Sequence, residues 1–164
     1  MSAAKKSPSS EADDLGIELA RFNRAFRSAV ERALEDVALS TSEYTALSVV
    51  EAHPQITAVR LARAMLISRQ VAGRVVAQLV TTGLVSTTRS PSGRISSASI
   101  TTRGTQTLSD ARERVRAVES QILSPLAPNE ALALISAMRR CADATGLQLL
   151  PGAPRNHRTE AARP

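Results

Sequence analysis

The fold is decided by residues 57–104, TAVRLARAMLISRQVAGRVVAQLVTTGLVSTTRSPSGRISSASITTRG. Thr57 and Ser68 each precede a helical spacing of apolar residues, so both are expected to cap short helices that follow in close succession. Gly83 is predicted to end the second helix, because glycine is favoured just beyond a helix C-terminus. Two segments rich in β-branched and hydroxyl residues then flank the turn sequence at residues 90–93, and they predict a hairpin.

Two helices are predicted before this segment. In the first, apolar residues recur every three or four positions, at Leu15, Leu19, Phe22, Phe26, Ala29, Ala33 and Val37. The second is expected to begin with Thr41 or Ser42 as its N-cap and to end before Pro54. His53 is predicted to be its C-terminal cap rather than a ligand, and Ile56 could supply a very short strand.

Two more helices are predicted after Gly104. The first has a coiled-coil-like spacing of apolar residues, at Leu108, Ala111, Val115, Val118 and Ile122. The second is expected from about Pro128 to Thr145, with Leu134, Met138 and Cys141 on one side. Cys141 is therefore expected to pack as a small buried hydrophobic group. A redox role, favoured by the two preceding arginines, is the alternative.

This order of elements predicts a mainly α-helical fold with a small β-hairpin wing. A winged helix-turn-helix domain is expected over residues 40–103, and a helical dimerisation region over residues 13–38 and 104–149. The apolar stripes of these outer helices exceed what one chain of this size covers, so we expect a homodimer. Residues 1–12 and 150–164 are expected to be a disordered arm and a disordered tail.

The composition indicates a soluble globular protein, with 43% hydrophobic and 22% charged residues among 164. No apolar run reaches the ~18 residues that span a bilayer, which argues against a membrane protein. Acidic Glu11 and Asp13 follow the basic N-terminus directly, so a secretory signal is not expected. A single cysteine cannot form an internal disulfide, and this favours the cytoplasm.

The charge is distributed unevenly along the chain. Residues 52–109 contain seven arginines and no acidic residue, whereas the rest of the chain contains 14 basic and 15 acidic residues. A folded segment with charge of one sign repels itself unless a polyanion lies against it. The central third is therefore predicted to bind nucleic acid.

The helix predicted at residues 68–82 has two distinct sides. Val71, Val75, Leu79 and Val80 are expected to face inward. The opposite side combines long hydrogen-bonding groups with small residues, as a helix in a DNA major groove requires. Arginine binds guanine and glutamine binds adenine through paired hydrogen bonds. The predicted DNA-contacting residues of this helix are Ser68, Arg69, Gln70, Gly73 and Arg74.

The hairpin loop carries an arginine at each end, Arg89 and Arg94. An arginine at the tip of a hairpin beside a groove helix can enter the minor groove, where narrow A·T tracts concentrate negative potential. Otherwise it contacts phosphate. Both arginines are therefore predicted to bind DNA.

Several motifs resemble those of the MarR-type winged-helix regulators. The family's Leu-Thr-x-x-Gln-Tyr-x-x-Leu is similar to LSTSEYTAL at residues 39–47, and its wing arginine followed by Leu-Thr-x-x-Gly is similar to Gly93-Arg94 and to ITTRG at residues 100–104. Further matches are Leu61-Ala62, Ile67-Ser68 and residues 79–85. The resemblance implies a homodimer that binds a palindromic operator and is often released by a small ligand. Ser92 replaces the family's usual aspartate two positions before the wing arginine.

The family resemblance also suggests a ligand crevice between the dimer helices and the winged domain. Phe22, Phe26 and Tyr44 are the aromatic residues near it. Core packing is the preferred interpretation for the two phenylalanines, whereas the Tyr44 hydroxyl could orient an acidic or phenolic effector.

An enzyme is not expected. The chain has no glycine-rich phosphate loop, His53 and His157 lie in unrelated segments, and Cys141 has no nearby histidine, so we predict no catalytic residue, metal or cofactor. The leading hypothesis is a dimeric DNA-binding transcriptional regulator, most simply a repressor. The alternative is a winged-helix interaction module whose basic face binds an acidic protein.

Overall fold

The computed structural model describes residues 8–89 and 95–145. Within these residues it contains six helices and a two-stranded antiparallel sheet, which confirms the predicted fold class. The elements are α1 (Pro8–Glu35), α2 (Thr41–Ala52), α3 (Ala58–Ala64), α4 (Arg69–Thr81), β1 (Val85–Arg89), β2 (Ile95–Ile100), α5 (Thr102–Leu123) and α6 (Pro128–Ala144). No helix among the described residues is long and apolar enough to cross a membrane.

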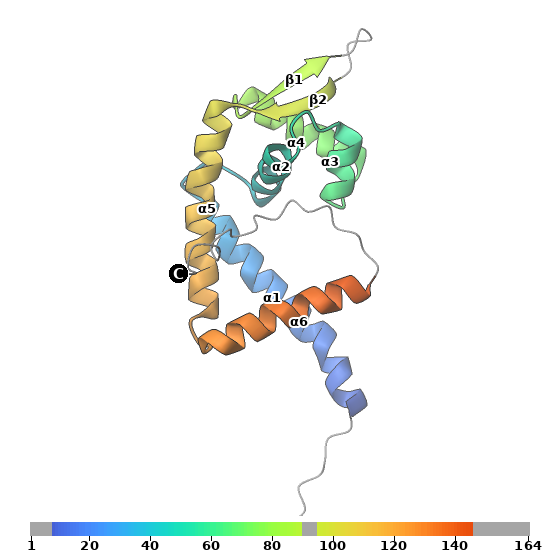
Figure 1. Cartoon of the computed structure of the whole chain (residues 1–164), viewed down its shortest axis with the longest axis vertical. Coiled ribbons are helices and arrows are strands. Elements are labelled where there is room, and N and C mark those ends of the chain that lie inside the picture. Colours follow the sequence, from blue (N-terminus) through green and yellow to red (C-terminus); the bar gives the residue numbers. More distant parts are fainter. Residues whose placement is uncertain (1–7, 90–94, 146–164) are drawn as a thin grey trace, which may run out of the picture.

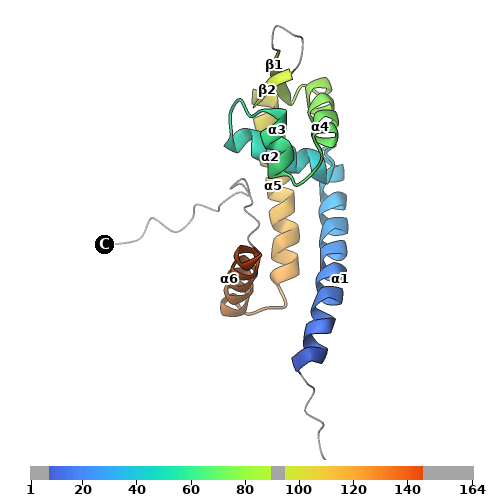
Figure 2. The same cartoon turned by 90° about the vertical axis from the view of Figure 1, so that its right-hand side faces the viewer.

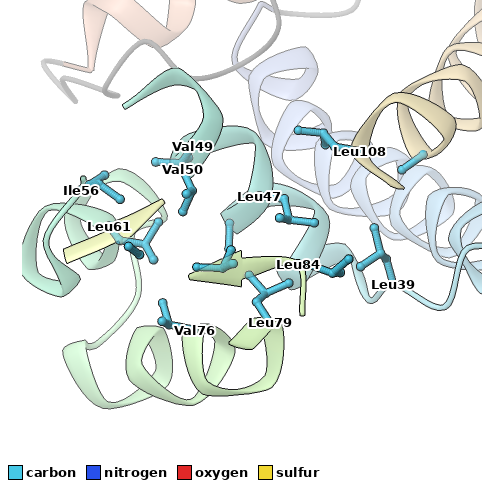
Figure 3. Packing of buried hydrophobic residues seen from close by; sticks show 14 of the residues in the cluster. Leu39, Leu47, Val49, Val50, Ile56, Leu61, Val76, Leu79, Leu84 and Leu108 are labelled. Atoms are coloured by element: carbon cyan, nitrogen blue, oxygen red, sulfur yellow. The ribbon is translucent and has the colours of Figure 1, made fainter. Parts of the chain in front are cut away.

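Figure 1 shows that α2, α3, α4 and the hairpin gather at one end of α5. We call this group, from α2 to β2, the winged unit. Its hydrophobic core is closed by residues from α1 and α5, and the largest fully buried side chains are Leu34, Leu47, Val50, Leu61, Leu79 and Leu108. Figure 3 shows side chains from several helices converging in this core.

Local capping determines where the helices of the winged unit begin. α2 begins one or two residues earlier than predicted, because its N-cap is Ser40 rather than Thr41 or Ser42. The Ser40 hydroxyl accepts the Glu43 N–H at 3.2 Å, and a Glu43 carboxylate oxygen accepts the Ser40 N–H at 2.8 Å. This capping box needs the glutamate three residues after the cap, and only Ser40 has that spacing. His53 is the C-cap, as predicted.

The two helices of the helix-turn-helix begin as the sequence predicts. Thr57 and Ser68 are the N-caps of α3 and α4, and each hydroxyl accepts a backbone N–H three residues later. Gly83 follows α4 with a φ of 73°, a left-handed conformation that favours glycine. The Leu84 N–H then donates to the Leu79 carbonyl at 2.8 Å, which completes a Schellman motif and turns the chain into β1.

The hairpin is joined to the helices at both ends. β1 and β2 pair from Val85 opposite Ile100 to Arg89 opposite Ile95. The Ala98 N–H donates to the Ile56 carbonyl at 2.9 Å, so Ile56 makes the short strand contact that was predicted. At the base, a side chain at Gly104 would meet the Leu84 carbonyl oxygen at 2.1 Å. Only glycine therefore allows α5 to approach the wing this closely.

The outer helices differ from the prediction at their ends. α1 begins at Pro8, so residues 8–12 are helical rather than part of a disordered arm. Proline is favoured in the first turn of a helix, and the acidic residues that follow it stabilise a helix N-terminus. Val37 lies beyond the end of α1, and α5 begins before Gly104. The predicted tail at residues 150–164 lies outside the described residues.

Candidate nucleic-acid interface and ligand pocket

α4 presents the predicted polar side to solvent. Arg69, Gln70 and Arg74 are all exposed. An added Cβ at Gly73 would meet no atom within 4 Å, so the surface here is open to another molecule. Ser68 is exposed as well, and its hydroxyl caps the helix. The structure therefore brings all five predicted residues of this segment onto one accessible end and side of α4.

The buried side of α4 differs from the prediction by a rotation of the helix. Ala72, Val76 and Leu79 are the buried residues, whereas Val80 is 39% exposed. Val71 and Val75 are half-buried. Ala72, Val76 and Leu79 follow a spacing of four and three, which places them on one face. Val80 was wrongly placed inside because apolar residues at positions 75, 76, 79 and 80 allow more than one helical phase.

The basic span keeps its charge on the surface of the described chain. Its arginines Arg60, Arg63, Arg69, Arg74 and Arg103 are all exposed. Figure 1 shows the hairpin at the same end of the molecule as α4. Arg89 lies at the end of β1, but its side chain and the whole of Arg94 and Ser92 lie outside the described residues. A role of the two wing arginines in DNA binding stays a prediction.

A cavity of about 660 Å³ lies between α1, α5 and α6 and reaches α2. We call it the pocket. Its apolar end is lined mainly by Leu19, Phe22, Ile122, Leu123, Leu134 and Met138, and its polar end by Tyr44, Arg112, Arg116 and Glu119. Figure 2 shows α6 on one side of α5 and α1 on the other.

All three predicted ligand residues line the pocket. Phe22 and Phe26 stack with their ring centroids 6.3 Å apart. Phe26 packs against the hydrophobic core, in agreement with the preferred interpretation, whereas Phe22 is 44% exposed. Tyr44 is half-buried, and this burial raises the pKa of its hydroxyl while the nearby Arg112 guanidinium acts to lower it.

Comparison with known proteins finds one family whose model matches part of the chain. Residues 39–94, which include α2, α3, α4 and β1, match the model of the MarR family. This segment of the chain is similar to the MarR family. This confirms the resemblance inferred from the motifs, and the matched segment covers the whole helix-turn-helix. No curated protein matches the chain in sequence.

Solved structures of MarR-family proteins share the fold. The chain is similar to the Mycobacterium tuberculosis protein Rv2887 in complex with DNA, with 24% identity, a TM-score of 0.69 and coverage of 77% of this chain and 96% of that one. The chain is also similar to Rv2887 in complex with salicylic acid, with 26% identity, a TM-score of 0.65 and coverage of 85% of this chain and 99% of that one. A third similar structure is CouR from Rhodococcus jostii RHA1 bound to p-coumaroyl-CoA, with 23% identity, a TM-score of 0.71 and coverage of 88% of this chain and 97% of that one.

Four charged residues of the pocket were missed by sequence reasoning: Arg112, Arg116, Glu119 and Arg139. The first three are spaced by four and three residues, so they form a stripe beside the apolar seam of α5. That spacing was a usable signal, although charged residues beside a seam usually face solvent. With three arginines and one glutamate, the lining of the pocket is more basic than acidic.

Arg112 makes the contact between α5 and the winged unit. Its Nη2 donates to Oε2 of Glu51 at 2.5 Å, and both side chains are less than one third exposed. A second ion pair, between Arg114 and Asp36 at 2.6 Å, is more exposed. The Nε of Arg112 is buried and has no hydrogen-bond partner.

Cys141 is exposed, which contradicts the expected packing role within one chain. Its helix, α6, has no buried residue, because no other element of the described chain packs extensively against it. The sequence correctly predicted the helix around Cys141. The apolar side of this helix is not covered by another part of the described chain. No group of three histidine, cysteine or acidic residues could hold a metal ion within the described ranges.

Proposed function

We propose that this chain is a sequence-specific DNA-binding transcriptional regulator in the cytoplasm, most simply a repressor, that acts as a homodimer on a palindromic operator. The observation that carries the proposal is the exposed side of α4, where Arg69, Gln70 and Arg74 extend from a span without acidic residues. Such a surface attracts a polyanion and offers groups that distinguish bases.

In the proposed complex, α4 lies in the major groove. Arg69 and Arg74 bind guanine or phosphate, Gln70 binds adenine, and Gly73 lets the DNA approach the helix closely. Each paired contact with a base is worth ~1–3 kcal/mol of discrimination. The wing places Arg89 and Arg94 beside the same site, in the minor groove or on phosphate.

The proposed dimer forms through residues 13–38 and 104–149. Large apolar side chains in this region are exposed in the single chain, and they are Leu15, Ile17, Leu19, Phe22, Leu132, Leu134 and Met138. A second copy that covers part of this surface would remove it from water. The two α4 helices would then bind half-sites one helical turn apart, ~34–36 Å.

The polar end of the pocket is proposed to bind a small aromatic acid or phenol that releases the DNA. Arg112 and Arg116 attract an anion, and Tyr44 and Phe26 offer aromatic surface for its ring. Among the similar structures, Rv2887 has been solved with salicylic acid and CouR with p-coumaroyl-CoA. These complexes support the same class of ligand here.

Selection of binding sites from a random duplex pool tests the DNA part of the proposal. We expect an inverted repeat, bound with an affinity whose logarithm falls linearly with the logarithm of salt concentration. Arg74→Ala should weaken binding by about 1–3 kcal/mol and relax the preference at one position of each half-site. Arg24→Ala, an exposed arginine on α1 outside the basic span, is the matched control.

The outcome also separates the two functional hypotheses. An affinity for DNA that does not change with salt contradicts the proposal. Recovery of no common sequence, together with binding to an acidic protein, supports the interaction module instead.

Tyrosine fluorescence tests the ligand part. The chain has one tyrosine and no tryptophan, so its fluorescence reports on Tyr44 alone. Salicylate absorbs where tyrosine emits, and its binding beside Tyr44 should quench this signal. Salicylamide, which lacks the carboxylate, should bind more weakly if the arginines hold the anion. Equal affinity for the two compounds would contradict the proposal that Arg112 and Arg116 bind the anion.

A further inference from the structure

Arg112 contributes both to the pocket and to the contact between α5 and the winged unit. It lines the polar end of the pocket, and its Nη2 holds Glu51 in the last turn of α2. The Nε of the same guanidinium is buried without a hydrogen-bond partner. A buried N–H group without an acceptor is unfavourable and is rare in proteins. The guanidinium therefore donates to the winged unit through Nη2, has an Nε without an acceptor, and belongs to a side chain that lines the pocket.

We propose that Arg112 transmits occupancy of the pocket to the winged unit, because an anionic ligand that binds its guanidinium weakens the hold of its Nη2 on Glu51. This inference rests on the proposed function and adds the residue pair that couples ligand to DNA. Arg112 carries a single positive charge, which two carboxylates would then share. The ligand carboxylate and Glu51 also repel each other at short distance in a partly buried site.

Glu51 is well placed to change the geometry of the winged unit. Two residues after it, His53 ends α2, and the chain continues through Ile56 to the N-cap of α3. The Ile56 carbonyl accepts the Ala98 N–H of β2. The end of α2 is thus joined to both the helix-turn-helix and the wing. Release of Glu51 from α5 would let these elements shift together, away from the arrangement that binds DNA.

The second ion pair of α5 provides a matched control. Arg114 binds Asp36, which lies just beyond the end of α1, and Arg114 does not line the pocket. Both pairs join α5 to an earlier part of the chain. Of the two pairs, only Arg112–Glu51 includes a residue that lines the pocket. If each pair only holds α5 in place, substitutions in the two pairs should have the same effect on the response of DNA binding to salicylate.

The test measures the affinity of the full-length chain for the selected duplex, with and without saturating salicylate. Coupling between two sites is typically 5–150-fold, so salicylate should weaken wild-type binding by roughly that factor. Glu51→Gln should bind the duplex more weakly than wild type and respond to salicylate by less than about twofold. Glu51→Asp, which keeps the carboxylate, should recover part of the response. Arg114→Gln should respond as wild type does.

Ligand binding without DNA gives an independent measurement through Tyr44 fluorescence. Arg112→Lys keeps the charge but removes the planar guanidinium, and it should weaken salicylate binding about tenfold, which corresponds to 1.4 kcal/mol. Glu51→Gln should bind salicylate more tightly than wild type, because Arg112 is no longer shared. Melting curves for each variant confirm that it is folded.

The outcomes separate this inference from the proposed function. A Glu51→Gln chain that keeps the wild-type response to salicylate overturns the inference and leaves the proposed regulator intact. Unchanged salicylate affinity in Arg112→Lys also overturns it, even if no operator is found. A wild-type chain that binds its duplex without any response to salicylate contradicts both the ligand part of the proposed function and this coupling.

Discussion

The two ends of α5 lie in very different surroundings. At its N-terminal end, Gly104, Leu108, Ala111 and Val115 are buried against the winged unit and α1. At the other end, α5 continues into α6, which has no buried residue at all. The first region completes a hydrophobic core within one chain. The second presents apolar residues in a helical pattern that nothing in the same chain covers.

This difference shows which part of the fold one chain can stabilise alone. The winged unit has a core to which five helices and the hairpin contribute, and its three helices have side-chain N-caps. The outer half of α1 and all of α6 have the spacing of buried helices without the burial. Their apolar faces gain free energy only when another surface removes them from water. We therefore expect the stability of the winged unit to be independent of protein concentration. The stability of the outer helices should rise with protein concentration.

The largest expected effect is on the core of the winged unit. Leu79→Ala should lower the free energy of unfolding by about 2–5 kcal/mol, because Leu79 is fully buried and its loss leaves a cavity. The neighbouring Val80→Ala should cost less than about 1 kcal/mol, since Val80 is 39% exposed and loses fewer buried atoms than Leu79. Urea unfolding of both variants measures the difference. Equal costs would show that the burial of α4 follows the sequence-based prediction instead.

The error at Val80 shows what the sequence could and could not predict. Thr57, Ser68 and Gly83 were predicted correctly because capping depends on a few neighbouring residues. The inward face of α4 was ambiguous because two adjacent pairs of apolar residues fit different helical phases. The contact between Glu51 and Arg112 joins positions 61 residues apart, so no local pattern indicates it. The exposure of Cys141 depends on what covers α6, which one sequence does not contain.

The second effect concerns the outer helices. Replacing Leu134 and Met138 by glutamine should weaken self-association, with a loss of about 1.5–3 kcal/mol for each side chain that the dimer fully buries. Sedimentation over a range of concentrations measures this loss. Asp143→Asn, on the opposite side of α6, is the control and should not change the association constant. A chain that is monomeric before substitution would refute the proposed dimer.

A smaller effect is expected at the start of α2. Ser40→Ala removes the hydroxyl of the capping box and should lower the free energy of unfolding by about 0.5–2 kcal/mol. Ser42→Ala tests the alternative cap suggested by the sequence and should be close to neutral, because Ser42 is an exposed residue within the helix. Thermal unfolding of the two variants compares them directly. A larger cost at Ser42 would contradict the capping box at Ser40.

The smallest effect on stability is expected from ionisation of Tyr44, a residue of the winged unit that lines the pocket. Its pKa is raised above the ordinary value of 10.0, chiefly by burial. The folded chain therefore holds the phenol proton more tightly than the unfolded chain does. The resulting contribution to stability is fully present below pH 10.0 and is lost as the pH rises through the folded pKa.

Absorbance of the phenolate measures this pKa without ambiguity, since the chain has a single tyrosine. The folded chain should titrate at a higher pH than the urea-unfolded chain. Arg112→Gln should raise the midpoint further, because the Arg112 charge favours the phenolate. Arg114→Gln should leave it in place, and Tyr44→Phe should abolish the absorbance change. A midpoint equal to that of the unfolded chain would contradict the burial of Tyr44, and a lower midpoint would mean that the charges of Arg112 and Arg116 outweigh that burial.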